Sequence, residues 1–224
     1  MWDADFTTSL RLSIQVACVA TLLVAVVGLG LAWLFATIPF RGKELLDLLV
    51  TLPLVLPPTV VGYYLIVLFG REGVIGFWLD HWLGISVTFH WSGAVLASFV
   101  VALPLMVKTT RAALEAVDSN LIAAAYTLGH SRLETAFRVT FPLARRGIFA
   151  GLVLAFARAI GEFGATLMLA GNIPGKTATM PLSIFSAAAS GEWSRTHAYV
   201  VVLTAFSALF LALANRYGRP PESN

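Results

Sequence analysis

The sequence predicts an all-α polytopic membrane protein with about five transmembrane helices, and three observations support this prediction. Of the 224 residues, 58% are hydrophobic and 12% are charged, whereas soluble domains average about 25% charged residues. The mean hydropathy is +0.82. Several apolar segments approach or exceed the roughly 20 residues that a membrane helix needs. These observations exclude a disordered chain, an ordinary nucleic-acid-binding domain and a typical soluble enzyme.

The apolar segments define the expected elements in order. Residues 12–38 contain no charged side chain. The residues before them include Asp3 and Asp5 close to the N-terminus, where a cleavable signal peptide would be basic. We therefore expect this first segment to be retained. The other expected spans are residues 48–70, 91–107, 147–170 and 197–215, and a short sixth element near residues 75–85 remains open.

Three prolines interrupt the second segment, and proline lacks the backbone N–H that a helix interior requires. They are Pro53, Pro57 and Pro58, followed by Thr59. In one interpretation residues 48–56 lie at the membrane interface and the span begins at Pro57. In the other, a kinked helix lines a path through the membrane with Pro57, Pro58 and Thr59 on it. The residues alone do not decide between the two.

Basic residues predict the orientation, because Lys and Arg accumulate in short cytoplasmic loops. With the N-terminus outside, ten Lys and Arg lie inside and four lie outside. We therefore expect an outside segment at residues 1–10, a transmembrane domain at residues 11–215 and a cytoplasmic tail at residues 216–224. The long inside loop at about residues 108–146 is a candidate docking surface.

This cytoplasmic loop is predicted to form two short helices around Gly129, a residue that suits a left-handed helix end. Asp118 supplies an N-cap, and Ser131 with Glu134 matches a capping box. Pro142 can open the next helix, where its missing N–H costs nothing. One face of the first helix carries Leu121, Ala124, Ala125 and Leu128. The loop is either a well-capped interfacial linker or a stiff lever that fits a partner's groove.

The same loop resembles that of a known transporter family. Residues 123–129 read Ala-Ala-Ala-Tyr-Thr-Leu-Gly and, after nine further residues, residues 139–142 read Val-Thr-Phe-Pro. This is similar to the Glu-Ala-Ala loop of ABC importer permeases, with Ala123 in place of the family's Glu. Other segments resemble the molybdate permease subunits of the MetI-like, type I importer family, at residues 52–63, 154–166 and 171–175.

The resemblance covers about residues 6–215 and implies the type I ABC importer permease fold. It implies a homodimer in the bacterial inner membrane, with two cytoplasmic ATP-binding subunits and an extracytoplasmic solute-binding protein. ATP and Mg would be bound by the partner ATPase, so we expect no catalytic residue, cofactor or metal in this chain, and no nucleic-acid partner. The family's coupling helix maps to about residues 123–131, and the implied coupling residues are Ala123, Ala124, Ala125, Gly129, Ser131 and Pro142.

The cargo that the resemblance implies is molybdate or tungstate. Sulfate and thiosulfate permeases share part of the matching segments, and the Pro57-Pro58 pair favours molybdate. An ion-coupled secondary transporter is a rival from another class, but it predicts inverted repeats that the five unequal segments lack. An intramembrane enzyme is a second rival, and it would need a nucleophile–base pair or metal ligands within the spans.

Two charges lie within the fourth predicted span. Arg158 and Glu162 are four residues apart, a spacing that places them on one helix face. A charge at the bilayer centre costs about 2.5–3.5 kcal/mol on insertion scales, so such residues pair or face a wet cavity. The pair either fixes helix packing or lines the translocation path or the dimer seam.

Overall fold

The computed structural model describes residues 4–84 and 86–218, and every regular element in that range is helical. Residues 1–3 of the expected outside segment and residues 219–224 of the expected tail lie outside the described residues. In chain order the elements are α1 (Ala4–Thr37), α2 (Lys43–Val55), α3 (Pro58–Phe69), α4 (Gly76–Leu83), α5 (Trp91–Glu115), α6 (Ser119–Thr127), α7 (Arg132–Thr135), the π-helical turn η1 (Ala136–Thr140), α8 (Phe141–Ile160), α9 (Gly164–Ala170), α10 (Met180–Ala189) and α11 (Trp193–Gly218).

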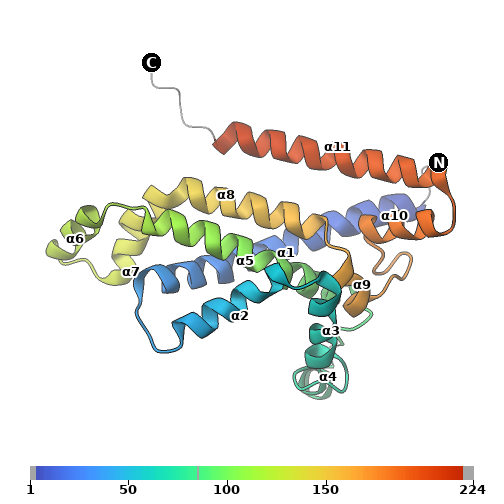
Figure 1. Ribbon diagram of the computed structural model, residues 1–224, viewed down its shortest axis with the longest axis horizontal. Coiled ribbons are helices and arrows are strands. Elements are labelled where there is room, and N and C mark those ends of the chain that lie inside the picture. Colours follow the sequence, from blue (N-terminus) through green and yellow to red (C-terminus); the bar gives the residue numbers. More distant parts are fainter. Residues whose placement is uncertain (1–3, 85, 219–224) are drawn as a thin grey trace.

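The long helices α1, α5, α8 and α11 follow the long axis of the molecule, and α5 packs against both α1 and α8 (Figure 1). Small residues let these helices approach closely, as in other membrane helix bundles. A Cβ added to Gly28 would lie 2.7 Å from Cγ of Met106, and one added to Gly151 would lie 3.0 Å from Sδ of that methionine. The buried core of these helices includes Val24, Ala102, Met106, Ala155 and Ala159.

Three of the five predicted spans are single helices, each longer than its predicted segment: α1, α5 and α11. The second is broken, because Leu56 and Pro57 are extended and separate α2 from α3. Pro53 is accommodated inside α2. The break therefore falls at the double proline, and it leaves both interpretations of residues 48–56 open.

The fourth predicted span is also broken, which corrects the expectation of one continuous helix. It consists of α8 and α9, and residues 161–163 between them are not helical. Gly161 ends α8, and Phe163 precedes α9 with φ −129° and ψ −62°. Hydropathy did not predict this break, because over a window of about 20 residues the apolar residues on both sides outweigh the short Gly161-Glu162-Phe163 stretch.

The two broken helices meet, because α3 packs against α9. A Cβ added to Gly62 would lie 2.6 Å from Cβ of Met168 and 2.9 Å from Cα of Ala165. A Cβ added to Gly164 would lie 3.0 Å from Cβ of Pro58. Two glycines, one on each helix, thus permit backbone contact between segments about 100 residues apart in the sequence.

Two further helices in the described part of the chain, α4 and α10, are also too short to cross a bilayer. The sixth element left open near residues 75–85 is α4, with 8 residues, which projects sideways from the bundle beyond α3 (Figure 1). It carries the exposed aromatic side chains of Phe77, Trp78 and Trp82. The other short helix is α10, which pattern analysis did not predict.

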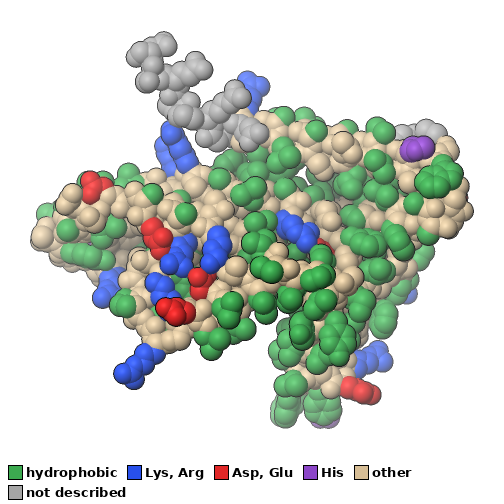
Figure 2. All heavy atoms as spheres, viewed as in Figure 1, with side chains coloured by type: hydrophobic (Ala, Val, Ile, Leu, Met, Phe, Trp, Pro, Cys, Tyr) green, Lys and Arg blue, Asp and Glu red, His purple; other side chains and the backbone are tan. Residues whose placement is uncertain are grey.

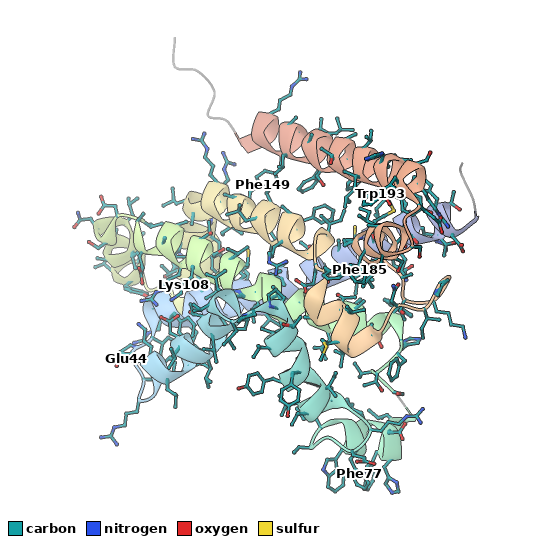
Figure 3. The ribbon with its side chains drawn as sticks, turned by 45° about the vertical axis from the view of Figure 1, so that its right-hand side comes forward. Glu44, Phe77, Lys108, Phe149, Phe185 and Trp193 are labelled. Atoms are coloured by element: carbon teal, nitrogen blue, oxygen red, sulfur yellow. The ribbon has the colours of Figure 1, made fainter. Side chains whose placement is uncertain are left out.

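An ion-pair cluster attaches α2 to the end of α5, outside the predicted span of residues 48–70. Nζ of Lys108 lies 2.8 Å from Oδ1 of Asp47, and Nη1 of Arg111 lies 3.3 Å from Oδ2. Figure 3 labels Lys108 on α5 and Glu44 on the neighbouring α2. The hydrogen bond from Lys108 holds the pKa of Asp47 below its ordinary value, and the charges of Lys108 and Arg111 act in the same direction.

We predict that Gly62→Ala destabilises the fold, because the added methyl group meets Met168 and the backbone of Ala165. The expected cost is about 1–3 kcal/mol, typical of overpacking. Gly30→Ala is the matched control, because nothing lies within 4 Å of its added Cβ and alanine favours a helix. Thermal unfolding in detergent should show a lower Tm for Gly62→Ala alone, and equal melting of the two variants would contradict the packing.

We also predict a pH-dependent effect of Asp47→Asn. The pKa of Asp47 is lowered in the fold, so its stabilisation is complete above the ordinary carboxyl pKa and is lost as pH falls through the lowered value. At pH 7 the variant should be less stable by up to about 1 kcal/mol. The difference should shrink towards pH 3 in thermal melts, whereas Glu44→Gln on the same helix should melt like the parent protein at both pH values.

Candidate functional site in the loop between α5 and α8 and in the broken helices

The loop between α5 and α8 is held by the caps that its sequence predicts. Oδ1 of Asp118 accepts a hydrogen bond from the backbone N–H of Asn120 at 2.9 Å. The Ser131 hydroxyl accepts from the Glu134 N–H at 3.3 Å, and the Glu134 carboxylate accepts from the Ser131 N–H at 2.9 Å. Gly129 has φ +86°, the left-handed conformation expected of it. These contacts confirm a capped helix–turn–helix unit.

The loop continues into α8 without interruption. The turn η1 joins α7 to α8, and Phe141 donates its N–H to the carbonyl of Ala136, five residues back. Pro142 lies in the first turn of α8, as expected, but α8 is not a separate segment. A π-helical turn accommodates one extra residue, and here it precedes the proline that lacks an N–H. The helical rod from Arg132 to Ile160 therefore links the loop to the membrane.

The loop exposes an apolar surface at the end of the molecule (Figure 1). Of the predicted apolar face, Ala125 is buried, whereas Leu121 and Leu128 are exposed, Leu128 to 79%. Ala123 and Ala124 are exposed as well. We call this the loop surface, and its large members are Leu121, Tyr126, Leu128, Leu133 and Phe137. Apolar side chains arranged in this way on a rigid unit suit a partner's groove.

Glu162 lies in the break between α8 and α9 and forms the ion pair that its spacing from Arg158 predicts. Nη1 of Arg158 lies 2.8 Å from Oε2 of Glu162. The other carboxylate oxygen, Oε1, accepts a hydrogen bond from the N–H of Ala165 at 2.8 Å, in the first turn of α9. We expected both residues on one helix, and this expectation is wrong, because α8 ends at Ile160 and Glu162 lies beyond it. The break turns the carboxylate towards both partners.

The two members of the pair differ in exposure. The Glu162 side chain is 1% exposed and the Arg158 side chain is 29% exposed. Gly164, two residues beyond Glu162, packs on Pro58 and Thr59 at the start of α3. The predicted candidates Pro57, Pro58 and Thr59 are thus brought to the break that holds Glu162, whereas the coupling-loop residues lie at the far end of α8.

Sequence reasoning missed two features of this region. One is the close packing at Gly62, which a search for small residues on both broken helices could have suggested. The other is α10, whose Phe185 ring lies 5.2 Å from the Phe163 ring in the break. Phe185 is labelled on α10 in Figure 3, close to α9. No sequence pattern connects these two phenylalanines.

At the opposite end from the loop, polar side chains close a small cavity of about 160 Å³. It lies between the start of α1, residues 172–178, α10 and α11. Arg195 contacts Asp5 at 3.4 Å and Glu192 at 3.3 Å, and Asn172 donates to the Ser186 hydroxyl at 2.6 Å. Within the described residues, no group of three or more His, Cys, Asp and Glu could hold a metal ion.

Comparison with known proteins identifies relatives along nearly the whole chain. The chain is 50% identical over 175 residues to the molybdenum transport system permease protein ModB of Escherichia coli K12, covering 78% of this chain and 76% of that protein. It is 44% identical to ModB of Haemophilus influenzae, covering 90% of each chain. The sulfate transport system permease protein CysT of Salmonella typhimurium is 34% identical, with 97% of this chain and 81% of that protein covered.

Solved structures show the same fold at low sequence identity. A bacterial ABC transporter for import of the acidic polysaccharide alginate matches with a TM-score of 0.81 and 14% identity, covering 99% of this chain and 81% of that one. The inward-facing MetNI methionine ABC transporter matches with a TM-score of 0.76 and 16% identity, covering 96% and 94%. The family described as "Binding-protein-dependent transport system inner membrane component" matches residues 7–219. The chain belongs to this family of transport permeases.

Proposed function

We propose that this chain is the permease subunit of an ATP-driven importer that carries molybdate, or the similar tungstate, into the cytoplasm. The observation that supports it most is the 44–50% identity to two molybdenum permeases over most of the chain. The permease itself would carry no catalytic group, and a partner subunit would hydrolyse ATP. Sulfate is the second candidate cargo, supported by the more distant likeness to a sulfate permease.

The loop surface is the proposed contact with the ATP-binding subunit. Its apolar side chains have no cover within the described chain, although the loop carries charged residues typical of an aqueous environment. The caps at Asp118 and Ser131 make the unit stiff. The helical rod from Arg132 to Ile160 then transmits a displacement of the loop into the membrane. Ala123, Ala124, Ala125, Gly129, Ser131 and Pro142 belong to this coupling element.

A second copy of the chain is the proposed partner within the membrane. The lateral faces of α2 and α3 expose large apolar side chains, including Leu48, Val55, Tyr63 and Tyr64. In a membrane, lipid or another copy covers such a surface. Two copies related by a two-fold axis would wall a path that one chain of this size cannot enclose, and cyclic dimers are the commonest closed assemblies.

The proposed orientation places the loop in the cytoplasm and the polar cavity outside. Lys and Arg gather towards the loop end of the molecule in Figure 2, as expected of a cytoplasmic side. Residues 1–10 would then be outside, residues 11–215 would form the transmembrane domain, and residues 216–224 would be the cytoplasmic tail. The cavity beside residues 172–178 would face the solute-binding protein.

The proposed cargo is tested by uptake into liposomes that hold the permease with its ATP-binding subunits and binding protein. Radiolabelled molybdate should accumulate with ATP, and unlabelled tungstate should compete more strongly than unlabelled sulfate. A complex without ATP is the control. Accumulation of sulfate in preference to molybdate would show that the proposed cargo is wrong but that the chain still belongs to an importer. Uptake driven by an ion gradient without ATP would refute the proposed ATP-driven importer.

We predict that Leu128→Asp uncouples the permease from its ATPase. The side chain of Leu128 is 79% exposed, and a carboxylate in its place would have to enter the apolar groove proposed on the ATP-binding subunit. Co-purification of the ATP-binding subunit should fall at least tenfold. Asn120→Asp adds the same charge to the exposed first turn of α6, and we expect it to leave co-purification unchanged. Equal retention of the ATP-binding subunit by both variants would show that the loop surface is not the contact.

A further inference from the structure

We propose that Arg158 makes a transient contact with the oxyanion as it crosses the membrane, and that Glu162 is the residue that positions Arg158. This inference rests on the proposed import of a tetrahedral oxyanion and names the side chain that the anion meets. It starts from the difference in solvent exposure between the two members of the ion pair. One member is enclosed by the protein and the other is open on one side.

Glu162 cannot itself face the anion, because its carboxylate is enclosed: one oxygen accepts a hydrogen bond, and the other is held in an ion pair without hydrogen-bond geometry. Oε1 accepts the Ala165 N–H at 2.8 Å, and Oε2 lies 2.8 Å from Nη1 of Arg158. An anion that approaches the pair therefore meets the guanidinium and not the carboxylate. The negative charge behind the guanidinium keeps the pair neutral overall.

Arg158 retains unused donors on its exposed side. A guanidinium carries five N–H donors in a planar fork. Within the described part of the chain, the guanidinium of Arg158 contacts one polar partner, Glu162, through Nη1. The fork matches tetrahedral oxyanions, which accept two parallel hydrogen bonds from it. Because Glu162 neutralises part of the field, the contact would be weak enough to release the anion, as conduction requires.

The surroundings favour a wet path over a lipid-facing position. Glu162 and its neighbours form irregular backbone between α8 and α9, and Gly164 packs on Pro58 and Thr59 where α2 and α3 are interrupted. Irregular backbone at membrane depth is tolerated only where protein covers it or water reaches it. An exposed guanidinium at the same place is tolerated for the same reason.

A pair that only secures packing makes a different prediction. Replacing both members of a buried ion pair with neutral residues is often harmless, whereas removing one leaves the other unpaired. A double-mutant cycle separates the two roles. We therefore compare Arg158→Met, Glu162→Gln and the double variant in the complete complex, reconstituted with its ATP-binding subunits and binding protein. Glutamine keeps an oxygen that can accept the Ala165 N–H.

The measured quantity is the amount of radiolabelled molybdate taken up per ATP hydrolysed, in assembled complexes only. We expect uptake per ATP to fall at least tenfold both in Arg158→Met and in the double variant. In Arg158→Lys it should fall about threefold, because lysine keeps the charge but lacks the planar fork of donors. Arg11→Met, at an exposed arginine on α1, should match the parent complex. Recovery of parental uptake per ATP in the double variant would overturn the proposal and leave the pair a packing device.

Three further outcomes are decisive. If Arg158→Met and the double variant fail to assemble, Arg158→Lys decides, and parental uptake per ATP in that variant would refute the contact. If the parent complex carries sulfate instead of molybdate, the same comparison is made with sulfate and tests Arg158 independently of the cargo. A parent complex and an Arg11→Met complex that both carry neither anion would refute the proposed function, and with it the anion contact.

Discussion

The hydrocarbon interior solvates neither a charge nor a free peptide N–H. In this fold one carboxylate interacts with both an arginine charge and a free N–H at a helix start. Glu162 neutralises Arg158 with one oxygen and caps the first turn of α9 with the other. Without it, the break after α8 would leave a guanidinium without its partner and a helix start without its cap. The position of α9 depends on this break, and so does the contact between α9 and α3.

The second structural constraint is close packing. Lipid tails are as apolar as the side chains they contact, so van der Waals contact and not water exclusion holds such helices together. Gly28, Gly151, Gly62 and Gly164 each stand where a neighbouring helix leaves little or no room for a Cβ. The first two join α1 and α8 to α5, and the last two join the broken helices. The same device therefore builds the straight core and the interrupted region beside it.

The loop and the break are two ends of one mechanical element. The helical rod from Arg132 to Ile160 begins at the capping box of Ser131 and ends next to Glu162. A force applied to the loop surface reaches the helix break through a single helix, with the π-helical turn η1 as its one irregular stretch. This connection gives a physical route by which a displacement of the loop changes packing around Arg158.

Local interactions are the part of this structure that could be predicted. The capping box at Ser131, the left-handed Gly129 and the Arg158–Glu162 pair all depend on residues within four positions of each other, and all are present. The spacing in α6 predicted an apolar helix face but not which part of it the rest of the chain covers: Ala125 packs inward, whereas Leu128 stays exposed. Which side of a short helix is covered depends on distant residues that no local pattern contains.

Hydropathy, helical spacing and caps act over a few turns of chain, and for that reason the membrane class, the approximate spans and the capped loop could be predicted from the residues alone. The resemblance to transport permeases followed from the same short segments. Packing in three dimensions places Pro58 of one span against Gly164, two residues beyond Glu162 of another, and leaves Arg158 partly exposed while Glu162 is enclosed. Those facts arise from packing between segments about 100 residues apart, where shape complementarity decides which residues meet.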